Sequence, residues 1–384
     1  MSAASSPARR RVAAGLFVLA ALASLRLSPA VACPFCGTVG ESIARKRAGA
    51  AAVCIAEAVG PAARDARGLL AVPFRVLHTL QGTLPDGIPA TLEARVAAPV
   101  AGTAVLFVSR DDPPRYSALA AEETVLGYVM RVPDADVPAA ERLAWFAARL
   151  EHPDGVIAED AFAEFAVAPF TDVRAAAAAL ADRPLGEWLS DPGIDQRRRG
   201  FYGLALGIVA AAGLPADAPA TSRPLREALA TVAGDFRTGA DGLMGGILVA
   251  DGPGGLEWLL GRAGPDRPVD QRQLLSALRF AWEYLGDSIP PEAVVAATAR
   301  LAGSVAVAAD AIVDLARYGA WGEVDAVAAW WDRAADDPLL RRAVAGYLLA
   351  CPEPAAAMHL ARLEREDPAG VAKARAAAAL PLGQ

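Results

Sequence analysis

The chain has 384 residues, 54% of them hydrophobic, and a formal net charge of −7. This length exceeds one ordinary domain core and predicts two domains, or one domain followed by an array. The first 32 residues hold four arginines and no acidic residue, so the remainder carries 33 basic and 44 acidic residues, a net charge near −11. Because phosphate backbones require a basic surface, this charge argues against a nucleic-acid partner.

Residues 1–32 have the three parts of a secretory signal peptide. Arg9–Arg11 form a charged start, Val12–Leu25 an apolar stretch, and Ala30-Val31-Ala32 a small-residue cleavage site. We therefore expect cleavage directly before Cys33 and export to the periplasm, the cell envelope or the medium. After the leader, no uncharged apolar run approaches the roughly 20 residues that span a bilayer. The general and twin-arginine export routes both stay open, and so does a lipid anchor on Cys33.

The mature chain would begin with the motif Cys33-Pro34-Phe35-Cys36, and the other cysteines are Cys54 and Cys351. Export places them in an oxidising compartment, so we expect a structural disulfide that joins Cys33 or Cys36 to Cys54, although spacing cannot choose the pairing. The motif is similar to the Cys-Pro-aromatic-Cys centre of glutaredoxins. That chemistry needs a preceding strand and a helix N-terminus at the first cysteine. Since no strand precedes the motif, thiol-disulfide chemistry is the alternative interpretation.

Residues 33–132 are predicted to form a small β-rich domain. Short apolar or alternating runs, separated by turn residues such as Leu84-Pro85-Asp86-Gly87, indicate strands. The predicted strands are Ala51–Val59, Val72–Leu80, Ile88–Val96, Thr103–Ser109 and Val125–Val132. Five strands in about eighty residues suit a small closed or partly open barrel of the OB type.

Residues 133–384 are predicted to be entirely helical and repetitive. Gly252, Gly286, Gly319 and Cys351 each follow an apolar helix, at intervals of 34, 33 and 32 residues. A helix-turn-helix unit that recurs at this interval is typical of an α-solenoid of HEAT-like repeats. The fold class that follows is α+β and multidomain, with a small OB-like β-barrel followed by an all-α HEAT-like solenoid.

Two features of the helical region are candidates for binding a partner. The run Arg197-Arg198-Arg199 is interpreted as part of an inter-repeat ladder of charges, with an anion-binding patch as the alternative. Helix 321–335 places Val324 and Trp331 on one apolar stripe, and Trp330 lies about 100° away from Trp331. Trp330 is therefore a candidate exposed contact for a partner, unless it packs between neighbouring repeats.

No catalytic constellation emerges from the sequence. The three histidines, His78, His152 and His359, are isolated, and neither a zinc-protease motif nor a nucleophile elbow occurs. Asp337 precedes a predicted helix, where its simplest role is to cap backbone N–H groups. The sequence predicts no metal, no cofactor and no catalytic residue, and the protein is more simply interpreted as a non-enzyme.

Four stretches resemble an uncharacterised family of exported bacterial proteins. They are Cys33–Cys36, Phe74-Arg75-Val76 through Leu80-Gln81-Gly82, Trp188-Leu189-Ser190-Asp191-Pro192 and Tyr347-Leu348-Leu349-Ala350-Cys351-Pro352. The resemblance implies a mature Cys-Pro-Phe-Cys start, an OB-like domain and HEAT-like helices, but no activity. A weaker resemblance to netrin-like and metalloproteinase-inhibitor domains implies a Cys33 amine that binds a protease's zinc, although their Cys-x-Cys start is absent here.

These observations favour an exported, non-enzymatic protein-interaction or scaffold protein whose partner lies in the envelope or outside the cell. A metalloproteinase inhibitor acting through Cys33 and a redox factor using Cys33 and Cys36 are the alternatives. The solenoid would offer its partner an extended concave face.

Overall fold

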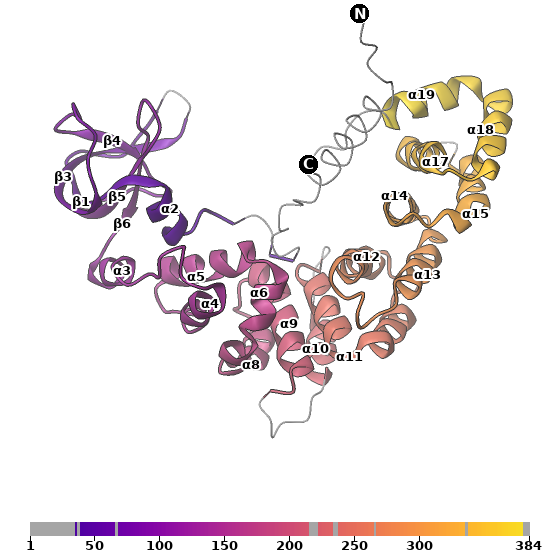
Figure 1. Ribbon diagram of the computed structural model, residues 1–384, viewed down its shortest axis with the longest axis horizontal. Coiled ribbons are helices and arrows are strands. Elements are labelled where there is room, and N and C mark those ends of the chain that lie inside the picture. The colour runs from indigo at the N-terminus through magenta and orange to yellow at the C-terminus, as the bar shows by residue number, and fades with distance from the viewer. Residues whose placement is uncertain are drawn as a thin grey trace, which may run out of the picture.

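A computed structural model describes residues 35–36, 39–65, 68–214, 222–232, 237–264, 266–334 and 337–378. The predicted signal peptide, Cys33 and the expected cleavage site lie outside the described residues. A sheet near the N-terminus is followed by helices that succeed one another along an arc (Figure 1). The molecule is therefore α+β, and apart from the short helix before the first strand the sheet precedes the helices, in the order that the sequence predicts.

The sheet has six strands, and an additional strand pairing closes the sheet back onto its first strand. The strands are β1 (Ala50–Ala58), β2 (Ala63–Arg64), β3 (Leu70–Gly82), β4 (Leu92–Arg95), β5 (Thr103–Ser109) and β6 (Tyr116–Ala120). Their order is β1-β5-β6-β4-β3-β2, and β1 also pairs with β3. Every pair is antiparallel except β4 with β6. The alternating side chains of β1, β3 and β5 enclose a separate small core that includes Cys54, Phe74 and Leu106.

The prediction of a last strand at Val125–Val132 is wrong. Residues 123–129 form helix α3 (Glu123–Val129), and the final strand is β6 instead. Val125, Tyr128, Val129 and Val132 are the buried members of this stretch. Their spacing of i, i+3, i+4 and i+7 is helical, and a short run rich in valine does not reveal its period unambiguously.

The helices pack mainly on their neighbours in the chain. After α2 (Ile43–Gly49) and α3 they are α4 (Ala139–Ala147), α5 (Gly155–Val167), α6 (Phe170–Ala175), α7 (Ala177–Ala181), α8 (Leu185–Ser190), α9 (Gln196–Ala211), α10 (Arg223–Thr231), α11 (Ala240–Arg262), α12 (Pro268–Tyr284), α13 (Pro291–Ala302), α14 (Ala308–Tyr318), α15 (Val324–Ala328), α16 (Trp330–Arg333), α17 (Pro338–Ala350), α18 (Pro354–Glu366) and α19 (Pro368–Ala378). In the second half, α12, α14 and α17 lie toward the inside of the arc, and α13, α15 and α18 lie toward its outside (Figure 1). We call α12, α14 and α17 the inner row.

The predicted repeat boundaries coincide with breaks between helical segments. Gly252 interrupts α11 with φ 55° and ψ −131°, and Gly319 ends α14 in the left-handed region. Glycine is the residue that adopts these conformations at little cost, which explains its place at both sites. Cys351 ends α17 in an extended conformation. The predicted cap at Asp337 is confirmed, because its carboxylate accepts from the backbone N–H groups of Leu339 and Leu340 at 3.0 Å.

Helices α9 and α11 cross unusually closely through glycines. A Cβ atom built on Gly207 would lie 2.2 Å from the carbonyl oxygen of Gly246, and one on Gly242 would lie 2.1 Å from that of Gly200. No larger residue fits between the two backbones at these points. The glycines therefore set the depth at which two central helices of the array pack.

Candidate functional site

The cysteines occupy two different cores. Cys36 is disulfide-bonded and 2% exposed, within the large core of the helical array. Cys54 is a free thiol buried in the small core of the sheet, where burial raises its pKa and its Sγ lies 3.7 Å from Thr79 Oγ1. The expected disulfide to Cys54 is therefore wrong, because packing separates Cys54 from Cys36. Cys351 is also free and buried.

The described part of the Cys-Pro-Phe-Cys motif is docked on the helical array. Phe35 is 6% exposed, and its ring packs edge-on against Phe280 of α12, with centroids 5.1 Å apart. The ring of Phe280 in turn contacts Phe170 at 4.9 Å. Cβ atoms built on Gly200 and Gly245 would lie 2.9 Å from the carbonyl oxygen and 2.7 Å from Cε2 of Phe35. Phe35 and Cys36 are thus covered by their own chain, which disfavours their insertion into a protease.

The free thiols provide a direct test of this cysteine arrangement. In protein unfolded without a reductant, we expect two reactive thiols per chain, those of Cys54 and Cys351. In the folded protein both thiols are buried and shielded from reagents, so we expect them to react slowly. At Cys54 burial also raises the pKa, which leaves little thiolate to react. Thiol titration with and without denaturant measures both quantities. Four reactive thiols in unreduced, unfolded protein would contradict the arrangement.

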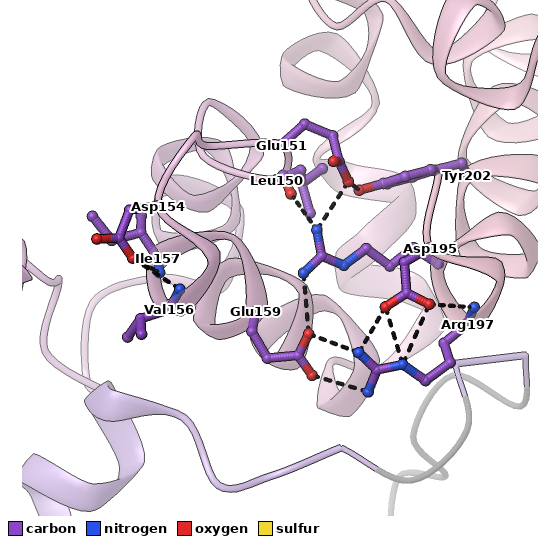
Figure 2. A network of polar contacts seen from close by, with 10 residues as sticks. Leu150, Glu151, Asp154, Val156, Ile157, Glu159, Asp195, Arg197 and Tyr202 are labelled. Atoms are coloured by element: carbon purple, nitrogen blue, oxygen red, sulfur yellow. Dashed lines mark hydrogen bonds and ion pairs between the residues drawn. The ribbon is translucent and has the colours of Figure 1, made fainter. Parts of the chain in front are cut away.

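The Arg197-Arg198-Arg199 run does not form one patch, because its members point in different directions. Arg198 is 7% exposed and bonds the carboxylates of Glu151 and Glu159, both at 3.0 Å. Arg197 is exposed and bonds Asp195 and Glu159, at 2.7 and 3.3 Å (Figure 2). Asp195 also caps α9 by accepting from the N–H of Arg197.

These pairs join α9 to the region of α5, so two of the three arginines are occupied by intramolecular carboxylates. The buried Tyr202 hydroxyl adds a hydrogen bond to Glu151. Arg199 is half-buried beside Gly239. The interpretation of the run as part of a charge network between helices therefore accounts for Arg197 and Arg198. An anion that bound here would have to displace the carboxylates that already pair with both arginines.

Trp330 does not offer an exposed ring to a partner. It is 6% exposed, and the neighbouring Trp331 is 2% exposed. The guanidinium of Arg333 lies 5.2 Å from the Trp330 ring, and that of Arg341 lies 4.7 Å from the Trp331 ring. The expectation that Trp330 is an exposed contact for a partner is therefore wrong, and its alternative, packing within the array, is what the structure has. A helix within the array packs on neighbours at more than one side, so adjacent tryptophans in different orientations are both buried.

An open groove lies along the inner row, between α14 and α17. Its volume is about 480 Å³, and it extends from Arg272 of α12 to Ala378 at the end of α19. Val305 and Leu339 line it and are 74% and 70% exposed. Four charged residues also line it, Arg272, Asp310, Asp337 and Arg342. The groove can therefore cover apolar side chains of a bound segment and offer charged groups to its polar atoms.

A buried polar network joins the start of the sheet module to the array. Asp160 of α5 accepts from the backbone N–H of Ile43 and from the hydroxyl of Tyr128, both at 2.6 Å. Glu164, one turn further along α5, accepts from the Ser42 hydroxyl and forms an ion pair with Arg142. Both carboxylates are buried, Glu164 completely. The first turn of α2 is thereby held against α5 by hydrogen bonds that water does not screen.

Burial raises the pKa of Asp160 to about 6, against the opposing hydrogen bonds from Tyr128 and Ile43. The folded chain consequently holds a proton between pH 4 and 6 that the unfolded chain has released, so this carboxyl's contribution to the free energy of unfolding falls as pH rises through that window. Glu164 and Lys46 also face Asp160, and their charges act in opposite directions on its pKa.

Asp160→Asn is expected to remove that pH dependence. Relative to wild type, the variant should gain stability as pH rises from 4 to 7.5, because only the wild type then buries an additional charge. Urea unfolding of both proteins across this range measures the difference. A difference that stays constant with pH would contradict a raised pKa at Asp160.

Within the described ranges, no group of three or more His, Cys, Asp or Glu side chains could hold a metal ion. His359 bonds Asp325 at 2.7 Å, and His152 accepts from the N–H of Asp154 at 3.0 Å. His78 is exposed on β3. None of the helices in the part of the chain that the structure describes has the length and apolarity to cross a membrane.

No protein-family model, no curated protein and no solved structure matches this chain. The features of the structure that bear on function are the groove, the docked Phe35 and the polar junction. The sequence did not indicate the groove, because its lining comes from four helices that are separated in the chain. Leu339, an apolar residue directly after the Asp337-Pro338 start of α17, is exposed at this groove in the structure.

Proposed function

We propose that this chain is an exported protein-interaction or scaffold protein that binds an apolar segment of another protein in the α14–α17 groove. The observation that carries the proposal is that two large aliphatic side chains, Val305 and Leu339, are both exposed in one groove that charged residues also line. Single exposed aliphatic side chains are ordinary on a protein surface. Two or more of them in one concave groove are typical of a binding site.

The proposed architecture is an OB-like barrel followed by a HEAT-like solenoid. The ring of pairings β1-β5-β6-β4-β3-β1, with a single parallel pair between β4 and β6, supports the barrel. Ion pairs between successive helical units support the solenoid, such as Arg279 of α12 with the fully buried Asp314 of α14 at 2.7 Å. The leader at residues 1–32 supports export to the periplasm, the cell envelope or the medium.

Site-specific photo-crosslinking in the exporting host tests the groove. A photoreactive phenylalanine at position 339 should give a discrete adduct with a partner protein. The matched control position is Met358 on α18, on the outside of the arc, which is 68% exposed and so equally accessible. Val305→Asp in the position-339 background should abolish the adduct, because a charge in the groove opposes burial of apolar side chains. Equal adducts at 339 and 358, or an adduct that persists with Val305→Asp, would overturn the proposal.

A further inference from the structure

Gly245 is a helical glycine that the contact between α9 and α11 does not explain. Glycine within a helix costs about 1 kcal/mol relative to alanine, so it persists where a side chain does not fit. Gly203, Gly207, Gly242 and Gly246 meet the facing backbone or Leu243 across the α9–α11 crossing. The three atoms nearest to a Cβ on Gly245 belong instead to the rings of Phe35 and Phe280.

The space left by Gly245 is therefore a socket for a phenyl ring. Gly200 forms its second wall, against the main chain of Phe35, and Phe280 forms its aromatic floor. The socket involves three helices, α9, α11 and α12, near the middle of the arc (Figure 1). The chain that enters it continues to Ser42 and Ile43, which α5 fixes through Glu164 and Asp160.

We propose that this socket is a binding site for an aromatic side chain on an extended peptide segment, and that Phe35 fills it as an intramolecular latch. The inference extends the proposed function, because it assigns a second, self-occupied site on the same array. Attachment at Ser42 and Ile43 keeps Phe35 at an effective concentration of ~mM beside the socket. A free segment of the same chemistry therefore competes with the tethered ring and binds more weakly while Phe35 is present.

The decisive probe is a fluorescent nonapeptide with the sequence of residues 33–41, its two cysteines oxidised to each other. Its binding is measured by fluorescence anisotropy on the mature wild-type chain and on Phe35→Ala. We expect saturable binding to Phe35→Ala, at least about tenfold tighter than to wild type, since the tethered ring competes in the latter. The same peptide with alanine in place of phenylalanine should not bind, because the ring supplies the contact with Phe280.

Filling the socket should weaken binding. Gly245→Ala in the Phe35→Ala background is expected to lower the affinity for the peptide, whereas Gly261→Ala, in the same helix with open space around it, should leave the affinity unchanged. The peptide variants need no change in the protein, so they test the inference even if a double variant folds poorly. Equal affinity for wild type and Phe35→Ala, or equal affinity of the phenylalanine and alanine peptides, would overturn it. Crosslinking at position 339 reports on the other groove, so the two proposals fail independently.

Discussion

Gly207→Ala is expected to lower the free energy of unfolding by about 2–3 kcal/mol or more, the cost of forcing a methyl group into a closed contact. The added Cβ would lie 2.2 Å from the carbonyl oxygen of Gly246 and 2.5 Å from its Cα. These are backbone atoms of a helix, so no side-chain rotation can relieve the overlap. Either α9 and α11 separate, which opens a void along their contact, or α11 bends.

The control is Gly346→Ala, also within a helix, where the nearest atom is the Cβ of Ala378 at 3.9 Å. There alanine should stabilise the chain by up to about 1 kcal/mol through its higher helix propensity. Chemical denaturation with circular dichroism measures both variants. If the two substitutions changed stability in the same direction and by similar amounts, the close crossing of α9 and α11 would not exist.

Arg142→Met is expected to cost about 3–5 kcal/mol, because it leaves a buried carboxylate without its counter-charge. Glu164 is fully buried, and Arg142 is its ion-pair partner; the Ser42 hydroxyl is its other hydrogen-bond donor. The loss should appear as a lower denaturation midpoint and as faster amide exchange around Ser42 and Ile43, since the same network holds the start of α2.

The double variant Arg142→Met/Glu164→Gln should recover most of that loss. The glutamine keeps an oxygen for Ser42 and removes the charge that lacked a partner, so the cost of the single substitution disappears. A single-variant cost below about 1 kcal/mol, the value typical of exposed pairs, would show that water reaches Glu164. Failure of the double variant to recover stability would instead indicate that Arg142 acts through packing.

Local sequence patterns were sufficient for most elements. The strand at 103–109 was predicted with the bounds that the structure has, because a short apolar run containing valine and phenylalanine and bounded by turn residues favours a buried strand. The helix starting after Asp337 was equally clear, because an aspartate cap and a proline at the first position act within one turn. The prediction of a strand at 125–132 failed, because eight residues rich in valine fit both the helical and the strand period.

The candidate site depended on contacts between distant segments. The sequence marked Cys-Pro-Phe-Cys as unusual, but nothing near Phe35 indicates that Gly245 and Phe280 surround its ring. Likewise Arg197 and Arg198 are adjacent in the chain, yet one is exposed and the other is buried between glutamates.

By itself, the sequence determined the order of the sheet before the long series of helices, the helix boundaries set by caps and glycines, and the excess of acidic residues after residue 32. Periodicity and capping operate over a few residues, and a single chain displays them directly. Only the tertiary structure decided that Cys54 stays a free thiol, that Trp330 is buried, and that Val305 and Leu339 share a groove. Each of these depends on which faces of distant elements meet, and that is set by the packing of the whole array.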